Sequence, residues 1–357
     1  MTITLDDVSQ IQGVPISGNA TVGPGSVDAE SFGLLVREGL GVPQEVIDEQ
    51  LTSNKLSNEW LKGYFSKKIH DDSTDAEVEY AVKGYLLFLF GCLLFVDKTG
   101  THISAAYLRL LMDYKEIQNY AWGAGILAYM FGALREASRA KVHQIACFVP
   151  LLEAWIYEHF PMFAPPPNMD YIEEQMPRMG RWTNISSTYP DPKSTLKWFR
   201  QVLWDPYSNV RDLRPLNHIS FFHGALCILD KTEPYNANRV LRQLGHKQTI
   251  STAPWPKKKD DSDTGERMFE VGTSHILSDD LRGDQAKTSW DFDIEYLYWF
   301  KDVSHPTMTP PNDFSNLHVP SYSWTDTIWK LGDLLVQDVE HGQTRLDELQ
   351  ELITTFR

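Results

Sequence analysis

The strongest pattern of apolar and polar positions lies between Asp75 and Phe160, where apolar residues recur at helical spacing. We expect Asp75 to cap a helix that is apolar on nearly every side and therefore buried. Its apolar residues are Val78, Val82, Leu86, Leu89, Phe90 and Leu93. Residues 97–100, Asp-Lys-Thr-Gly, are typical of a turn. After this turn, Ser104 is expected to cap a second helix that runs through Leu111.

Two longer helices are expected next, at residues 116–139 and 142–160. The first carries small residues that would let a neighbouring backbone approach closely, at about 1 kcal/mol of helix propensity for each glycine. These residues are Gly123, Ala124, Gly125, Ala128, Gly132 and Ala133. The stretch 123–125 superficially resembles a dinucleotide fingerprint, but it follows no strand, so helix packing is the better interpretation.

Weaker patterns flank this helical core. Residues 1–5 alternate like a short strand, and residues 6–14 could form one or two helical turns. Residues 219–229 form an apolar, partly β-branched run that predicts one or two strands. Asn236 is expected to cap a short helix at 237–244, which Gly245 would end. Further helices are expected at residues 31–40, 43–51, 58–68, 193–203, 291–303 and 324–340, with a final amphipathic segment at 344–356 and polar loops at 165–192 and 257–264.

The predicted fold is mainly α: a compact multi-helix domain with a small β element near residues 219–230 and a candidate strand at 1–5. We expect an N-terminal arm at 1–27 docked on a domain at 28–322, and a helical appendage at 323–357. The domain would hold the helical core, about 75–160, and a mixed part, about 193–303. The residues expected in its structural core are Leu86, Phe90, Trp122, Gly125, Trp155, Trp204 and Trp299.

Composition and charge narrow the classes of function. Apolar residues make up 42% of the 357, which is typical of a globular protein, and the formal net charge of −15 disfavours general binding to nucleic acids or anionic membranes. The three cysteines are far apart and lack metal-binding spacing, as expected of buried thiols in a reducing compartment. Because the N-terminus lacks a basic and then an apolar region, we expect no secretory signal.

Residues 178–247 are locally basic, with 11 Lys and Arg against 5 Asp and Glu, or +6. Guanidinium groups suit carboxylates, phosphates and nucleic-acid backbones, so this segment could bind an anion or a partner. The alternative is that the same side chains tie the fold together through ion pairs. The candidates are Arg178, Arg181, Trp182, Lys197, Arg200, Arg239, Arg242 and Gln243.

Catalytic and metal-binding patterns are weak. Lys193, Lys197, Lys231 and Lys247 stand beside polar or turn residues, unlike the pocket lysine that pyridoxal phosphate requires, so we expect no cofactor. The histidines at 143, 159, 218 and 223 lack metal-ligand spacing, so no metal is expected. Glu153 and Glu158 lie on different faces of one helix and do not form an acid–base pair.

Several segments, in this order along the chain, closely resemble the plant mobile domain family. They are YAWGAGILAYMFGALREASR at 120–139, LLEAWIYEHFP at 151–161, the Arg-Trp pair at 181–182, WDPY at 204–207, RVLRQLG at 239–245 and WFKDVSHPTMTPP at 299–311. The resemblance extends from the N-terminus to the His-Pro pair at 305–306. Relatives usually have a further segment before the part that resembles residues 1–18, so the strand expected at 1–5 would lack its usual partner.

The resemblance implies a nuclear protein without enzymatic activity that acts in transposon silencing, gene expression and genome integrity in meristems. It also implies a protein partner, a phosphatase-seven-like protein or another mobile-domain protein. Members occur both as host proteins and inside transposable elements, so a nucleic-acid-associated factor that uses the basic segment at 178–247 is the alternative. The family is sometimes labelled aminotransferase-like, but the label brings no chemistry that can be assigned to residues of this chain.

Overall fold

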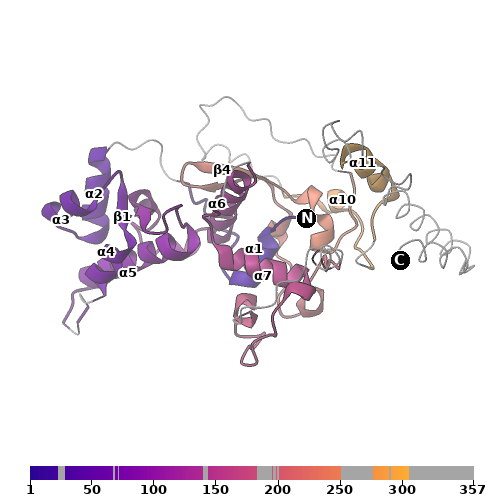
Figure 1. Cartoon of the computed structure of the whole chain (residues 1–357), viewed down its shortest axis with the longest axis horizontal. Coiled ribbons are helices and arrows are strands. Elements are labelled where there is room, and N and C mark those ends of the chain that lie inside the picture. Colours follow the sequence, from indigo (N-terminus) through magenta and orange to yellow (C-terminus); the bar gives the residue numbers. More distant parts are fainter. Residues whose placement is uncertain are drawn as a thin grey trace, which may run out of the picture. The chain divides into compact units, whose positions relative to one another are not determined.

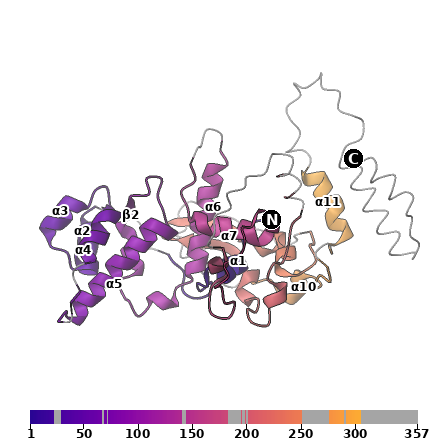
Figure 2. The same ribbon diagram turned by 60° about the horizontal axis from the view of Figure 1, so that its bottom comes forward.

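The computed structural model describes residues 1–22, 29–66, 69–70, 72–139, 144–182, 195, 198, 201–250, 276–288 and 291–304. The chain divides into two compact units, Met1–Trp299 and Phe300–Arg357, and the first contains nearly all the described residues. This unit is mainly helical with two small antiparallel sheets, which confirms the predicted fold class (Figures 1 and 2). The segments expected at 257–264, 324–340 and 344–356, and most of the helix expected at 193–203, lie outside the described residues.

One group of helices packs around the pair of strands β1 and β2. The strands, Lys55–Ser57 and His102–Ser104, are antiparallel, with Leu56 opposite Ile103. Both of these side chains are buried. The helices confirm those expected in this region: α2 (Ala29–Leu40), α3 (Gln44–Gln50), α4 (Asn58–Phe65) and α5 (Asp75–Leu89).

Helix α5 differs from the prediction in its cap and in its burial. Its N-cap is Thr74 rather than Asp75, because the Thr74 hydroxyl accepts a hydrogen bond from the Glu77 N–H while the Glu77 carboxylate accepts one from the Thr74 N–H. The prediction that α5 is buried on every side was wrong. Only the face toward α2 and α4 is covered, whereas Val78 and Val82 are 40% and 45% exposed. A π-helical turn, η1 (Phe90–Leu94), continues the helix.

Helices α1, α6 and α7 form a second group (Figure 1). Their bounds are Leu5–Gln12, Trp122–Ala137 and Val149–His159. Both α6 and α7 begin later than expected. A 3-10 turn, η3 (Ile117–Asn119), precedes α6, and the Trp122 indole N–H donates to the Ile117 carbonyl at 2.7 Å. Pro150 stands in the first turn of α7, where its missing N–H costs nothing.

The strand expected at residues 1–5 is not formed. Thr4 caps α1 in a capping box with Asp7, and the helix begins at Leu5. The main chain of Thr2 instead pairs with one side chain: its N–H donates to Gln243 Oε1 at 3.0 Å, and its carbonyl accepts from Gln243 Nε2 at 2.7 Å. An amide side chain thus replaces the neighbouring strand, and α1 is buried between α6, α7 and the 3-10 turn at Arg178–Arg181, η5.

A β-hairpin confirms the β element expected near residues 219–230. Strands β3 (His223–Ile228) and β4 (Lys231–Asn236) pair in antiparallel register, with Ala225 opposite Pro234. Every residue of β3 is buried, in part because α6 packs on it. Residues 218–221 form a 3-10 turn, η7, rather than a strand.

The short helix expected after the hairpin is a pair of 3-10 turns, η8 (Ala237–Arg239) and η9 (Leu241–Leu244). Its expected boundaries are confirmed. The Asn236 side chain accepts from the Asn238 N–H, and Gly245, with φ of 78°, ends the second turn in the left-handed conformation. Ser104 likewise caps a helix, but that helix is the 3-10 turn η2 (Ala105–Leu110).

Short helices complete the described chain: η4 (Pro161–Phe163), η6 (Ser208–Val210), α10 (Asp279–Arg282) and α11 (Ile294–Ser304). In the part of the chain that the structure describes, every helix is too short or too polar to cross a membrane.

The residues expected in the core occupy different depths. Phe90 and Trp122 are buried and in contact, with ring centroids 5.0 Å apart, and they join the α5 region to α6. Leu86 and Trp155 are half-buried against the core. Trp299, in contrast, is 38% exposed on α11, where its ring contacts Tyr296.

Two glycines allow α6 to approach its neighbours closely. A Cβ atom at Gly123 would lie 2.7 Å from Ile16 Cγ2 and 3.1 Å from Val8 Cγ1. At Gly125 it would lie 2.7 Å from Thr21 Oγ1. Glycine lowers the helix propensity at these positions, but the missing side chain allows the N-terminal residues to pack directly on the α6 backbone.

We expect Gly123→Ala to lower the free energy of unfolding, because the added methyl would overpack a buried contact at about 1–3 kcal/mol, more than the gain of about 1 kcal/mol in helix propensity. Gly63 of α4 is the matched control, since a Cβ there would meet no atom within 4 Å. Urea unfolding should show that Gly63→Ala stabilises the protein and Gly123→Ala destabilises it. Stabilisation by both substitutions would contradict this packing.

Candidate functional site

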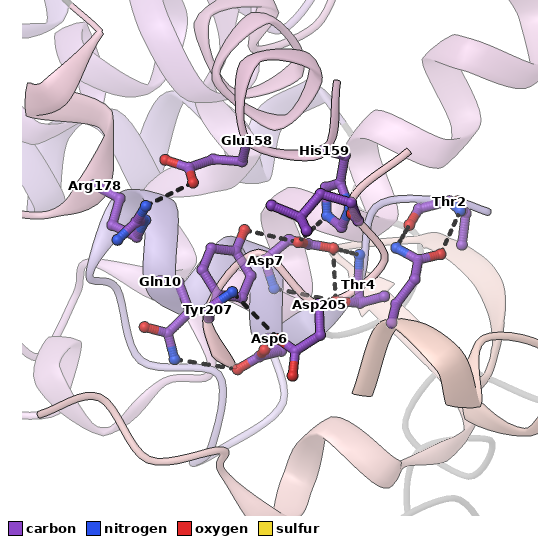
Figure 3. A network of polar contacts seen from close by, with 12 residues as sticks. Thr2, Thr4, Asp6, Asp7, Gln10, Glu158, His159, Arg178, Asp205 and Tyr207 are labelled. Carbon is purple, nitrogen blue, oxygen red and sulfur yellow. Dashed lines mark hydrogen bonds and ion pairs between the residues drawn. The ribbon is translucent and has the colours of Figure 1, made fainter. Parts of the chain in front are cut away.

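The densest group of polar side chains surrounds the Asp6-Asp7 pair at the start of α1 (Figure 3). The Asp7 carboxylate accepts four hydrogen bonds. Thr4 donates through its N–H and its hydroxyl, each at 2.7 Å to Oδ2. The Tyr207 hydroxyl and His159 Nε2 both lie 2.8 Å from Oδ1. His159 is 0% exposed, and Asp7 and Tyr207 are each 1% exposed, so water does not reach this group.

The partners of His159 fix its protonation state. Nδ1 lies 2.8 Å from the Leu203 carbonyl oxygen, which can only accept, and Nε2 faces a carboxylate that already accepts from Thr4 and Tyr207. Both ring nitrogens therefore carry a proton, and the residue is an imidazolium paired with an aspartate.

Electrostatics agree with this assignment. Burial alone would raise the pKa of Asp7, but the His159 charge and the hydrogen bonds from His159, Thr4 and Tyr207 hold that pKa below its ordinary value. Burial alone would lower the pKa of His159, but the Asp7 charge and hydrogen bonds to Asp7 and the Leu203 carbonyl raise it above 6.5. Burial and the adjacent carboxylates raise the Tyr207 pKa well above 10, so its hydroxyl stays a donor.

Asp6 faces the other way and binds Arg211. The two guanidinium nitrogens of Arg211 lie 2.8 and 3.2 Å from the two carboxylate oxygens of Asp6, which is bidentate geometry. Arg211 also reaches Asp205 at 2.9 Å. The pair fastens the first turn of α1 to residues 205–211, which belong to the same segment as Tyr207.

A second buried ion pair lies next to the first along the chain. Glu158, which precedes His159, accepts from Arg178 at 2.7 Å and from the Trp182 indole at 2.8 Å. Arg178 also binds Glu173 at 2.9 Å, and Glu173 pairs with Arg214 at 2.8 Å. Arg214 further donates to the carbonyls of Glu173 and Met176. The last turn of α7 thus holds α1 through His159 and the loop at 161–182 through Glu158.

The geometry of these buried groups suits the fastening of backbone segments to one another rather than catalysis. Asp7, His159 and Tyr207 resemble the members of an acid–base relay, but both ring nitrogens and both carboxylate oxygens have protein partners and none is accessible to a substrate. In the described part of the chain, no three or more His, Cys, Asp or Glu residues gather as metal ligands would.

The structure brings some of the candidate binding residues together and separates others. Arg178, Arg181 and Trp182 share the 3-10 turn η5 and the residue after it, where Arg178 is 3% exposed in its ion pairs and Arg181 lies 4.8 Å over the Trp182 ring. Both Trp182 and Glu173 belong to the loop at 161–182, which these ion pairs anchor to α7.

Gln243 lies near the start of α1, where it is buried against Thr2. Arg239 is exposed on η8, and the Arg242 guanidinium stacks 3.9 Å over the half-buried Trp204. Lys197 and Arg200 lie outside the described residues.

Sequence reasoning missed Asp6, Asp7, Tyr207, Arg211 and Arg214. One signal was available, because Thr4-Leu-Asp-Asp7 matches the spacing of a capping box. The contacts of His159, Tyr207 and Arg211 with Asp6 or Asp7 join residues 152 to 205 positions apart, and Arg214 contacts Glu173 across 41 positions, which no local pattern records.

Comparisons with known proteins agree on one family. A family model described as the plant mobile domain matches residues 1–301. The chain is 26% identical to Protein MAIN-LIKE 2 of Arabidopsis thaliana over 349 residues, which cover 88% of this chain and 49% of that protein. It is 25% identical to Protein MAINTENANCE OF MERISTEMS of the same plant over 335 residues, or 86% of this chain and 66% of that protein.

A third relative, Serine/threonine-protein phosphatase 7 long form homolog of Arabidopsis thaliana, is 25% identical over 353 residues, or 88% of this chain and 26% of that protein. The chain therefore spans between a quarter and two thirds of these three relatives. No solved structure matches it.

The Asp7–His159 pair predicts how stability depends on pH. A raised histidine pKa means that the folded state binds the proton more tightly, so this contribution is complete below pH 6.5 and is lost as pH rises through the raised value. The lowered pKa of Asp7 means that its contribution is lost as pH falls below 3.8.

Urea unfolding between pH 6 and 9 should therefore show a falling free energy of unfolding in the wild type, and a smaller fall in Asp7→Asn. Asp170→Asn, at an exposed position, is the control and should behave like the wild type. The assignment of charge fails if the wild type and Asp7→Asn differ by a constant amount over this range.

Arg178→Met should leave Glu158 as an unpaired buried charge and cost about 3–5 kcal/mol of stability. Arg181 lies three residues away and its side chain is half-exposed, so Arg181→Met should change the free energy of unfolding by less than about 1 kcal/mol. Chemical denaturation of both variants measures the difference. Equal losses would show that Arg178 does not anchor the loop through its ion pairs.

Proposed function

Because this chain belongs to the plant mobile domain family, we propose that it is a non-enzymatic nuclear scaffold for protein interaction that acts in transposon silencing, gene-expression control and the maintenance of meristems and the genome. The name of one relative, MAINTENANCE OF MERISTEMS, supports the meristem role. The proposal concerns the mobile domain itself, since the chain spans only part of its relatives.

The observation that carries the proposal is an anchored loop with apolar side chains on its surface. Within residues 161–182, four of these side chains are 37% to 94% exposed: Met162, Met169, Ile172 and Met176. Methionine is flexible and polarisable, so it adapts to the surface of a partner better than branched residues do. Four exposed apolar side chains within 15 residues of one loop favour an interaction site there.

The loop is held in place before any partner arrives. Beside the ion pairs of Arg178 and Arg214, the Asn168 N–H donates to the Arg181 carbonyl at 2.8 Å, and the Asn168 side chain donates to the Gly180 carbonyl at 3.3 Å. Preorganisation lowers the entropy lost on binding. The central polar network therefore contributes to function by fixing a surface, without touching a partner.

We propose a phosphatase-seven-like protein as the partner, with another mobile-domain protein as the alternative. In support, one relative of this chain is itself named a phosphatase 7 long form homolog, and the similarity covers 26% of its length. Asp170 and Glu174 are exposed beside the loop methionines and favour a partner surface that combines apolar and basic groups.

A nucleic-acid role through residues 178–247 has less support from the described side chains. Arg178, Arg211 and Arg214 are engaged by buried or half-buried carboxylates, and Lys247 lies 3.3 Å from Asp284. Cations that already neutralise carboxylates contribute less to phosphate binding. We therefore favour a protein partner.

The test is a double substitution, Met169→Asp with Ile172→Asp. It should abolish co-purification with a phosphatase-seven-like protein and leave the melting temperature unchanged, because both side chains are exposed. Leu34→Asp, on α2 at 44% exposure, is the matched control and should retain binding. If the double variant binds as the wild type does in isothermal titration, the loop is not the docking surface.

A further inference from the structure

The outer face of α5 carries a row of apolar side chains that no described element covers. Val78, Val82 and Tyr85 are 40%, 45% and 60% exposed, Leu89 is half-buried, and Cys92 in the following π-helical turn is exposed. These five residues form the α5 seam. The row extends over slightly less than four helical turns, whereas the opposite face of α5, with Ala81 and Leu87, is buried.

The spacing of the seam is that of a coiled coil. Starting from Asp75, which is exposed at the first position of α5, the members within the helix follow at steps of three, four, three and four residues, and Cys92 comes three residues later in the π-helical turn. Alternating steps of three and four are the a and d positions of a heptad, where each side chain inserts between side chains of a facing helix. The seam therefore fits another helix that runs along it.

The two ends of the seam carry opposite charge. Asp75 stands at one end, with Asp72 and Glu77 also exposed nearby. At the other end, Lys62 of α4 is exposed and lies close enough to Cys92 for its charge to oppose the burial that raises the pKa of that thiol. An identical helix in the opposite direction would place each acidic end against a basic end, whereas a parallel copy would oppose like charges.

We propose that the α5 seam binds the α5 seam of a second copy of this chain, in antiparallel orientation about a twofold axis. In this register Val78 of one copy packs against Leu89 of the other, and Val82 packs against Tyr85. Asp75 then lies beside Cys92 and Lys62 of the other copy. The contact is isologous, so every interaction occurs twice.

The dimer uses a different face from the loop at 161–182 and does not depend on the function proposed for that loop. Because the apolar seam is short, we expect self-association to be reversible and to depend on concentration. A scaffold with two copies of its docking loop would bind a multivalent partner more tightly than a single copy would.

Sedimentation equilibrium of the full chain should show a monomer–dimer equilibrium. Val82→Glu should be monomeric with an unchanged melting temperature, since the position is exposed, and Leu213→Glu, at 55% exposure away from α5, should dimerise like the wild type. Asp75→Lys and Lys62→Glu should each weaken the dimer, and the two together should restore it. A wild type that stays monomeric, a Val82→Glu variant that dimerises normally, or a charge-swapped double variant that fails to recover would each overturn the proposal.

Cross-linking tests the register. Asp75→Cys places a thiol beside Cys92 of the other copy, while within one chain the 17-residue separation along α5 and η1 keeps the two thiols about 25 Å apart. Mild oxidation should give a covalent dimer that disappears in Asp75→Cys with Cys92→Ser. A dimer that forms equally without Cys92, or no cross-link in a sample that sedimentation shows to be dimeric, would contradict the antiparallel register.

Discussion

The Asp7 carboxylate and the His159 imidazolium, both buried, hold the first helix of the fold against the last turn of α7. Removing two charges from water costs several kcal/mol for each ion, and the pair is stable only because its remaining hydrogen-bonding groups also have partners. Thr4, Tyr207 and the Leu203 carbonyl supply these partners. Such a pair tolerates little displacement, so it fixes where α1 lies, and α1 in turn fixes how closely α6 and the hairpin approach.

The same turn of α7 connects this interior to the surface. Glu158 and His159 are adjacent in sequence, yet one holds Arg178 of the loop and the other holds Asp7 of α1. The ionisable groups at the centre of the fold thus position the backbone, and the surfaces that we propose for recognition are formed by apolar side chains outside it, on the loop at 161–182 and on α5. This division of roles is what one expects of a scaffold whose partners bind to its surface.

Local signals in the sequence predicted the fold class, the position of the hairpin and several boundaries, because caps at Asn236, Ser104 and Gly245 depend only on neighbouring residues. They failed at residues 1–5, where an apolar alternation too short to decide between strand and helix obscured the capping box of Thr4 and Asp7. They also failed at α5, since periodicity shows that a residue is apolar but not which face of the helix finds a neighbour. Glu158 and His159 stand out in the sequence as ionisable neighbours, but their partners come from other segments, and only the folded chain brings them together.

The most direct test of this account is the protonation of His159. Nitrogen-15 NMR of the imidazole, assigned with His159→Gln, should show two N–H protons at pH 7 that exchange slowly with water and do not titrate near 6.5. A ring that titrates near 6.5, or that exchanges its protons rapidly, would mean that this group is open to solvent, and the interior would then have to be considered as a reactive site.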